Sequence, residues 1–265
     1  MRLGCCVNML GSADDPIGRR YIRAVKEAGY DYVELPLAQV MELSEQEFGG
    51  LLDELDAAAL PCRCCNNFFP ASVRLTGENA DLAAAEDYVA RAVKRAARLG
   101  AERIVFGSSG AKNVPEGFSH ERAFEQIVEV LRLADRYVQP EHICIVIEPL
   151  NRKESNIILN LTDGERLVKA VDRPSVRLLV DYYHFRMEEE SPEVLRQAMP
   201  DIRHVHFAEP QGRSFPTGES ADYESFFEIL REGNYTGGVS IEAYASCPKQ
   251  ELARAVLVRK YFEEN

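Results

Sequence analysis

Residues 81–106 read DLAAAEDYVARAVKRAARLGAERIVF, and this stretch shows the unit from which the chain is built. Its first part carries small and apolar residues at helical spacing, at Leu82, Ala85, Val89, Ala92, Val93 and Ala96. Gly100 follows as a stop signal, because a glycine takes up the left-handed conformation that ends many helices. Arg103–Phe106 then has the composition of a strand, so the stretch predicts a helix over 81–99 joined to a strand by a tight turn.

The same alternation of short strand-like runs and longer amphipathic stretches can be counted eight times along the chain. The runs contain many Val, Ile and aromatic residues with little polar alternation, which is typical of strands buried on both faces. Similar helix-glycine-strand joints occur around Gly29 and Gly233, and Asp15-Pro16 predicts the start of the first helix. The expected strands are residues 3–8, 32–35, 61–66, 103–106, 143–147, 176–180, 202–207 and 238–241.

Eight such units predict a single (β/α)8 TIM barrel that forms one domain over residues 1–265. The chain has 265 residues, 46% of them hydrophobic, which is enough to bury a substantial core. A doubly wound open sheet is the alternative, since it has the same local pattern. The strand-to-helix connections at 108–119 and 209–221 are the longest, and in a barrel such loops build the active face.

The net charge of −12 and the pI near 5.0 disfavour nucleic acid as a partner, because phosphate backbones are bound through many Lys and Arg contacts. No apolar run approaches the roughly 20 residues that cross a bilayer, and the first residues lack a signal-peptide layout. We therefore expect a cytoplasmic protein without a membrane partner.

The seven cysteines do not suggest a disulfide scaffold, because their number is odd and the chain is large. Cys5-Cys6 and Cys64-Cys65 are adjacent pairs within strand-like runs, which indicates buried, reduced thiols. A zinc site made of Cys62, Cys64 and Cys65 would have the wrong spacing and lacks a second cluster.

Four late strands end in residues that bind metals: Ile147-Glu148-Pro149, Val180-Asp181-Tyr182, Val205-His206-Phe207 and Ile241-Glu242-Ala243. They are separated by 33, 25 and 36 residues, each about one βα unit. If the barrel closes, strands five to eight are neighbours, and these four side chains converge on one mouth.

Three carboxylates brought together in a low-dielectric site repel one another, so the cluster needs a cation or protonation. One divalent metal ion meets this need, with manganese favoured and magnesium, cobalt or zinc possible. Taken singly, each acid is more often a helix cap or a surface ion pair than a metal ligand, and it is the occurrence of four such residues on consecutive strands that favours the metal site. His204 faces the same side of its strand as His206; we expect it to lie in the core, with exchange of the two roles as the alternative.

These motifs carry a resemblance. The run IEPLNRKE at 147–154, DYYH at 181–184, HVH at 204–206 and IE at 241–242 resemble the sugar phosphate isomerase/epimerase group of xylose isomerase-like barrels. Within that group the pattern is most similar to that of D-tagatose and D-psicose 3-epimerases. The resemblance covers essentially the whole chain. The motif with Glu154 six residues after the first ligand, Glu148, is fairly specific for this group.

The resemblance implies roles for individual residues. Glu148 and Glu242 would be metal ligands and also the catalytic acid/base pair, and Asp181 and His206 would complete the metal site. The positions that bind substrate oxygens would be Glu154, His184 and Arg213. A carbohydrate would be the substrate, and a homodimer or homotetramer the assembly.

The chemistry expected of such a site is removal of a proton next to a carbonyl, through a cis-enediolate whose charge the metal stabilises. Return of the proton to the same carbon from the other face gives an epimer, and return of the proton to the adjacent carbon gives an isomer.

The chain has no Trp, a residue that the ketohexose epimerases often place around the sugar. Phe68, Phe69 and Phe118 either take this place or pack against the barrel rim.

Three other functions compete with this interpretation. The same site suits a metal-dependent lyase or dehydratase acting on an inosose or a 3-keto sugar. A hydrolase similar to apurinic endonucleases is disfavoured by the acidic charge and by the lack of histidines at the earlier strand ends. A non-catalytic binding protein would not need both glutamates. Gly107–Lys112 could bind a phosphate, although a flexible loop is the more common structure for such a composition.

Overall fold

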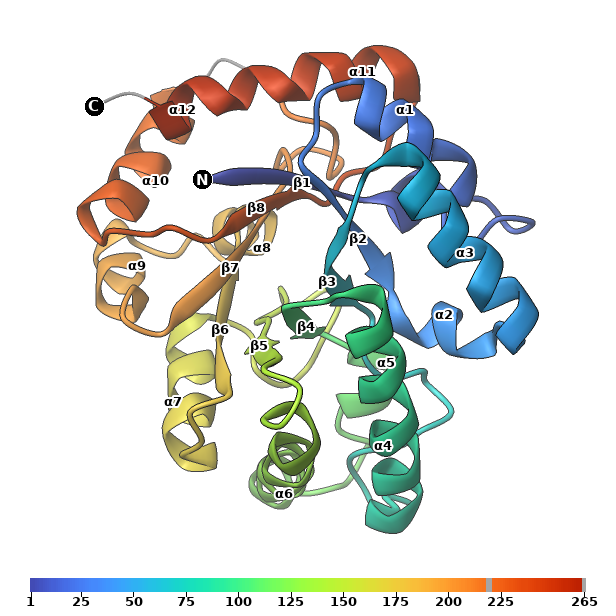
Figure 1. Ribbon diagram of the computed structural model, residues 1–265. Helices are drawn as coiled ribbons and strands as arrows, with labels where there is room; N and C mark the ends of the chain where they lie inside the picture. The colour runs from blue at the N-terminus through green and yellow to red at the C-terminus, as the bar shows by residue number, and fades with distance from the viewer. Residues whose placement is uncertain (218–220, 264–265) are drawn as a thin grey trace.

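The computed structural model describes residues 1–217 and 221–263 and places their strands in a closed parallel barrel. The strands pair in chain order and β8 pairs with β1, so no strand edge is left open. Figure 1 shows the helices arranged around this barrel. The strands are β1 Arg2–Cys6, β2 Tyr32–Pro36, β3 Cys62–Asn66, β4 Arg103–Phe106, β5 Cys144–Ile147, β6 Val176–Asp181, β7 Ile202–Phe207 and β8 Gly238–Ile241.

The quoted stretch behaves as predicted. Helix α4, Leu82–Leu99, begins where the Asp81 side chain accepts hydrogen bonds from the backbone N–H groups of Ala83 and Ala84, and it ends at Gly100 with φ of 80°. The other helices are α1 Ile22–Glu27, α2 Leu37–Glu42, α3 Glu45–Ala58, α5 Ser109–Lys112, α6 His120–Val138, α7 Leu161–Val171, α8 Tyr182–Met187, α9 Pro192–Ala198, α10 Ala221–Glu232, α11 Pro248–Ala255 and α12 Lys260–Glu263, with 3-10 turns η1 Val7–Leu10, η2 Arg19–Tyr21 and η3 Val256–Arg259.

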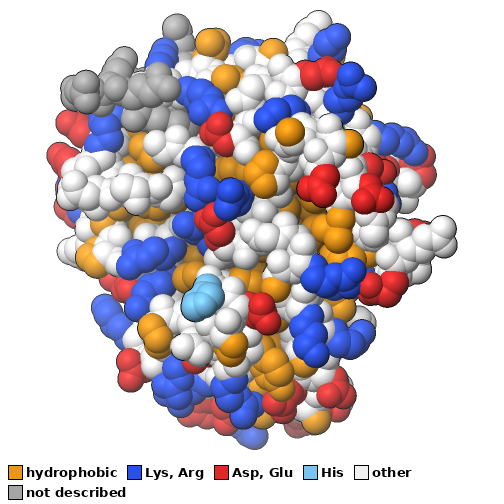
Figure 2. Space-filling view, in the orientation of Figure 1, with side chains coloured by type: hydrophobic (Ala, Val, Ile, Leu, Met, Phe, Trp, Pro, Cys, Tyr) orange, Lys and Arg blue, Asp and Glu red, His pale blue; other side chains and the backbone are white. Residues whose placement is uncertain are grey.

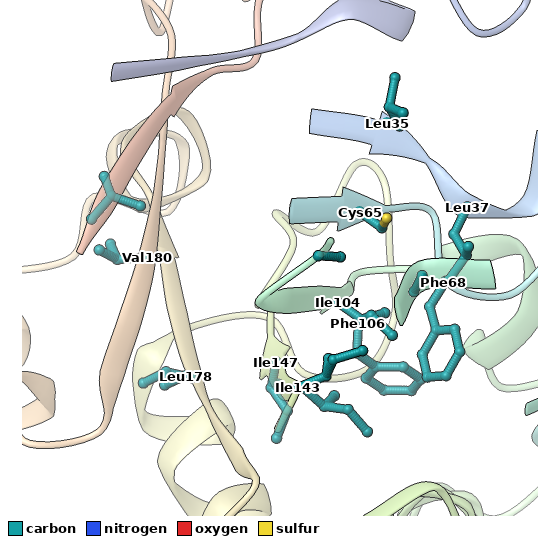
Figure 3. Packing of buried hydrophobic residues seen from close by; sticks show 14 of the residues in the cluster. Leu35, Leu37, Cys65, Phe68, Ile104, Phe106, Ile143, Ile147, Leu178 and Val180 are labelled. Carbon is teal, nitrogen blue, oxygen red and sulfur yellow. The ribbon is translucent and has the colours of Figure 1, made fainter. Parts of the chain in front are cut away.

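Strand residues are buried on both faces because successive side chains point alternately outward to the helices and inward to the barrel. The outward set forms the large core, part of which Figure 3 shows, with Leu35, Ile104, Phe106 and Val180 among its labelled side chains. A separate inner cluster consists of Cys64, Val105, Val146 and Leu179. The inner positions nearer the carboxyl ends of the strands are polar, and they build the site.

Three local predictions need correction. The first strand ends at Cys6, because Val7–Leu10 turns into η1. The first helix does not begin after Asp15: the Asp15 carboxylate accepts backbone hydrogen bonds from Gly18, Arg19 and Arg20 and so caps a turn. The helical residues therefore start at Arg19, with α1 proper from Ile22. The loop expected at Gly107–Lys112 contains the short helix α5.

The surface carries both signs of charge. Figure 2 shows basic and acidic side chains interspersed over the face in view. None of the described helices is both long and apolar enough to cross a membrane.

Candidate active site

Four side chains meet where strands β5 to β8 end. The strand register places Asp181 beside His206, and Glu148 and Glu242 directly follow β5 and β8. All four are buried, and ligand atoms of the four lie within 4.8 Å of one another. The structure thus brings together the four residues that the sequence predicts as metal ligands.

His206 lies at the centre of this cluster. Its Nδ1 is 2.9 Å from Oε1 of Glu148 and 3.0 Å from Oε2 of Glu242. Asp181 uses Oδ1 to cap α8, accepting a hydrogen bond from the backbone N–H of Tyr183, while its Oδ2 faces the site. The helix-cap explanation of a strand-end acid therefore holds for one oxygen of Asp181, whereas the other belongs to the cluster and accepts a hydrogen bond from Arg213.

The carboxyl groups are in electrostatic conflict. Burial raises the pKa of Glu148, and the neighbouring Glu242 adds to the rise. Burial also raises the pKa of Asp181 to about 7, even though Arg213 opposes the shift. For Glu242 burial is outweighed by the charges of His206 and Arg213, which lower its pKa to about 2. The cluster thus contains one carboxyl that ionises readily and two that resist ionisation.

Arg213 and His206 supply the positive charge. Nη2 of Arg213 lies 3.1 Å from Oδ2 of Asp181 and also pairs closely with Oε2 of Glu242. Burial would lower the pKa of His206, but the charges of Glu242 and Glu34 raise it well above its usual value. Without a metal ion, these two cations offset the charge of the carboxylates.

The three residues predicted to bind substrate also lie here. Glu154 accepts a hydrogen bond from the Asn151 side chain and lies 3.4 Å from Nη1 of Arg213. His184 is buried, and its Nδ1 accepts the backbone N–H of Asn151 at 3.1 Å. Its Nε2 lies 3.5 Å from Oδ2 of Asp181 and has no hydrogen-bond partner among residues 1–217 and 221–263. The structure places all three beside the cluster of four.

A cavity of about 330 Å³ opens above the cluster, and a sugar-sized ligand fits the scale of such pockets. Glu148, Glu242, Glu154 and Arg213 line it together with polar residues of the β2, β3 and β4 loops. Phe69 also lines the cavity, whereas Phe68 is fully buried behind it at a ring separation of 4.2 Å. Phe118 is absent from the lining and packs against the core.

Lys112 and Gly107 are two residues whose part in the site the sequence did not reveal. The Lys112 side chain is fully buried and donates to the carbonyl oxygen of Gly107 at 2.5 Å, so its charge is turned away from any phosphate on the loop. Gly107 itself leaves room for Glu148, because an added Cβ would lie 2.2 Å from Oε2 of that residue.

Glu34 on β2 was also missed. This fully buried carboxylate lies 2.9 Å from Nε2 of both His204 and His206. His204 is therefore part of the barrel interior, as expected, and is not one of the cluster of four. The one sequence signal for a role of Glu34 in the site is its position as a charged residue inside an apolar strand-like run.

The cysteines are all free, as the sequence predicts. Cys62 and Cys65 pack into the outer core while Cys64 lies in the inner cluster, so these three do not form a site together. Cys64 does lie within reach of Glu34 and His204, and Cys6 within reach of Glu34 and His206.

Several known proteins are similar to this chain in sequence or in fold. An L-ribulose 3-epimerase of Methylomonas sp. (strain DH-1) is 27% identical over 232 residues, which cover 86% of this chain and 79% of the relative. A ketose 3-epimerase of Arthrobacter globiformis is 28% identical over 253 residues, covering 93% and 84%. The crystal structure of a D-psicose 3-epimerase from Clostridium cellulolyticum H10 with D-tagatose superposes with a TM-score of 0.84 over 99% of this chain and 98% of that one, at 19% identity.

A sequence model of one family matches residues 22–259, which include β2 to β8 and every residue of the cluster of four. This match confirms the resemblance to xylose isomerase-like barrels that the sequence motifs indicate. The strand order confirms the closed barrel that the resemblance implies. The chain belongs to the xylose isomerase-like TIM barrel family.

Proposed function

We propose that this chain is a divalent-metal-dependent epimerase or isomerase of a ketose or related keto-sugar. Similar proteins include 3-epimerases of L-ribulose and of ketoses, a 3-dehydro-D-guloside 4-epimerase and a hydroxypyruvate isomerase, and the chain is an enzyme of the isomerase class. The single observation that carries the proposal is the pair Glu148 and Glu242, whose carboxylates lie 2.9 and 3.0 Å from His206 Nδ1 and line one cavity.

The residues of the cluster fit a metal ion. Three carboxylates and one imidazole are buried together although their charges repel, and this donor set suits a divalent cation, for which we propose manganese. Glu148, Asp181, His206 and Glu242 would hold it. When bound, the ion polarises a carbonyl oxygen and stabilises the negative charge that develops when the neighbouring carbon loses a proton.

Glu148 and Glu242 move the proton. Without a metal ion, burial raises the pKa of Glu148, whereas at Glu242 the charges of His206 and Arg213 outweigh burial and lower the pKa, so the two carboxyls differ in their affinity for a proton. Removal by one glutamate and return by the other inverts the configuration at the carbon between them. The same pair could instead expel a hydroxyl group, which is the lyase alternative.

Glu154, His184 and Arg213 orient the sugar. Because His184 Nδ1 accepts from the backbone of Asn151, its proton lies on Nε2, which is buried, has no hydrogen-bond partner in the described part of the chain, and can donate to a substrate oxygen. Burial lowers the pKa of His184 well below its usual value, so this donor is a neutral imidazole. Arg213 and Glu154 lie at the cavity wall, where hydroxyl groups can reach them.

Turnover of Glu148→Gln and Glu242→Gln on a panel of ketoses and keto-sugars with manganese tests this proposal. Both variants should lose at least about 100-fold in kcat, since a glutamine cannot transfer the proton. Glu129→Gln, an exposed position on α6, is the matched control and should keep wild-type activity. Wild-type turnover by either site variant would overturn the acid/base assignment.

The assembly, the number of domains and the cellular location stay predictions. We expect one domain over the chain and a homodimer or homotetramer in the cytoplasm. Analytical ultracentrifugation measures the assembly directly.

A further inference from the structure

Glu34 holds together a polar network inside the barrel, below the cluster of four. Its Oε1 lies 2.9 Å from Nε2 of His206, and its Oε2 lies 2.9 Å from Nε2 of His204 and accepts the Ser240 hydroxyl at 2.7 Å. The Tyr32 hydroxyl is 2.9 Å from Ser240 Oγ. Glu34 comes from β2 and its partners from β7 and β8, so the network crosses the barrel interior.

The network fixes the position of the proton on His206. A carboxylate only accepts hydrogen bonds, so each imidazole that meets Glu34 through Nε2 must carry a proton there. In a neutral His206 the other nitrogen, Nδ1, then has a lone pair. Nδ1 lies 2.9 and 3.0 Å from oxygens of Glu148 and Glu242, so either a proton on Nδ1 or a metal ion must lie among these three atoms, and a metal ion that binds there takes the place of that proton.

We propose that Glu34 is a positioning residue that holds His206 with its proton on Nε2, so that Nδ1 is the nitrogen that binds the metal ion. Ser240, His204 and Tyr32 hold Glu34 in turn. A carboxylate that fixes the far nitrogen of a ligating histidine orients the ring and strengthens the ligand. This inference rests on the proposed metal site and adds to it the identity of the ligating atom and the residue that selects it.

A different use of Glu34 would be a second metal ion bound with Cys64 and His204, whose ligand atoms also lie within 4.8 Å of one another. The hydrogen-bond network explains the structure better. Both Glu34 oxygens are already engaged by histidine and serine donors, and Cys64 packs with Val105, Val146 and Leu179, where a thiolate would be poorly solvated. The two alternatives differ in how many ions each chain binds.

The first test uses the wild-type protein, labelled with ¹⁵N-histidine, stripped of metal and titrated with ¹¹³Cd²⁺. The chain has five histidines, so their ring signals can be assigned by substitution. We expect one cadmium ion per chain, scalar coupling of cadmium to Nδ1 of His206, and a proton retained on its Nε2. Coupling to Nε2 of His206, or a second ion that couples to His204, would overturn the inference about Glu34. Cadmium that couples to no histidine would instead overturn the proposed metal site itself.

The second test is Glu34→Gln. Glutamine has nearly the same shape, but its NH₂ group must face one imidazole Nε2–H, so one of the two histidines loses its acceptor. We expect manganese affinity to fall about 10- to 100-fold and excess manganese to restore kcat, which loss of fold would not allow. Ser240→Ala is the matched control, because it removes a donor to Glu34 without touching His206, and its loss of affinity should be smaller. A folded Glu34→Gln protein with wild-type manganese affinity would contradict the proposal. If that variant does not fold, the cadmium coupling measured on the wild-type protein tests the proposal instead.

Discussion

At the scale of single residues, Gly107 is a position of the site that leaves no room for a larger side chain. An added Cβ would lie 2.2 Å from Oε2 of Glu148, far inside van der Waals contact. We expect Gly107→Ala to displace that carboxylate, weaken manganese binding and reduce kcat at least about 10-fold, because small misplacements of reacting groups are costly. Metal titration and steady-state kinetics measure both effects.

The control for this substitution is Gly49→Ala on α3, where an added Cβ meets nothing within 4 Å. Alanine should be neutral or slightly stabilising there, because it is the better helix former. If Gly107→Ala bound manganese as tightly as the wild type, either Glu148 would not be a metal ligand or its position would not depend on the space at Gly107.

Arg213 is the second residue with a distinct expectation. Its guanidinium contacts Glu154, Asp181 and Glu242 at once and stacks over the Tyr183 ring at 4.9 Å. A lysine presents a single charged nitrogen and cannot reproduce this fork. Arg213→Lys should lower kcat/KM about 100-fold while the melting temperature stays unchanged. An unchanged kcat/KM would show that Arg213 does not bind the substrate.

The four strand-end residues of the site could be predicted from the sequence, whereas Glu34 could not, and the difference has a physical reason. Glu148, Asp181, His206 and Glu242 each end an apolar strand run, and closure of the barrel alone brings strand ends together. Glu34 is different, because its partners His204 and Ser240 are 170 and 206 positions away and touch it only across the barrel interior. No spacing along the chain encodes such a contact.

At the scale of elements, strands were easier to predict than helix starts. The expected and observed strands differ by at most two residues at their ends, because burial on both faces marks them clearly. The first helix was placed too early because Asp15-Pro16 looks like a helix cap. Gly18 explains the delay: it has φ of 82°, and a Cβ there would lie 2.0 Å from the carbonyl oxygen of Val7.

Glu190, in the connection between α8 and α9, gives a prediction about pH. Its carboxylate accepts the backbone N–H of Leu161 at the start of α7, and burial raises its pKa to about 7. A raised folded-state pKa means that ionisation is unfavourable in the folded protein, so Glu190 destabilises the fold as pH rises above its unfolded pKa and most fully above pH 7.

Glu190→Gln should therefore stabilise the protein at pH 8, by about 1–2 kcal/mol given the partial exposure, and have little effect near pH 4. The amide oxygen can still accept from Leu161. Urea unfolding of both proteins at the two pH values measures the difference. Equal stability at pH 8 would show that the Glu190 carboxylate is better solvated than its burial suggests.

At the scale of the whole molecule, closure of the barrel was predicted by counting eight βα units, and the structure confirms it. The cavity above the site was less predictable. The segments after β2, β3 and β4 build much of its wall; the first contributes helix α2 and the third contains helix α5, whereas the remaining loop sequences show no periodicity from which their shape could be derived. The preferred sugar depends on these loops.

Metal binding should depend on pH across the neutral range. In the metal-free protein the pKa of Asp181 is about 7 and that of His206 is raised, and each group must lose its proton to coordinate an ion. Manganese binding at pH 7 should therefore release protons, and affinity should fall as pH drops from 8 to 6. Calorimetry in buffers of different ionisation enthalpy counts the protons; no release would mean that these groups are already deprotonated.

The central claim is that two glutamates move a proton on a carbon next to a carbonyl. Incubation of the manganese-loaded enzyme with ketoses, keto-sugars and inososes in deuterated water, followed by NMR, tests it most directly. We predict deuterium at the carbon adjacent to the carbonyl of the true substrate, appearing with the epimer or isomer; a dehydrated product in its place would favour the lyase. A product formed without any deuterium, or no reaction with any keto compound, would contradict the account.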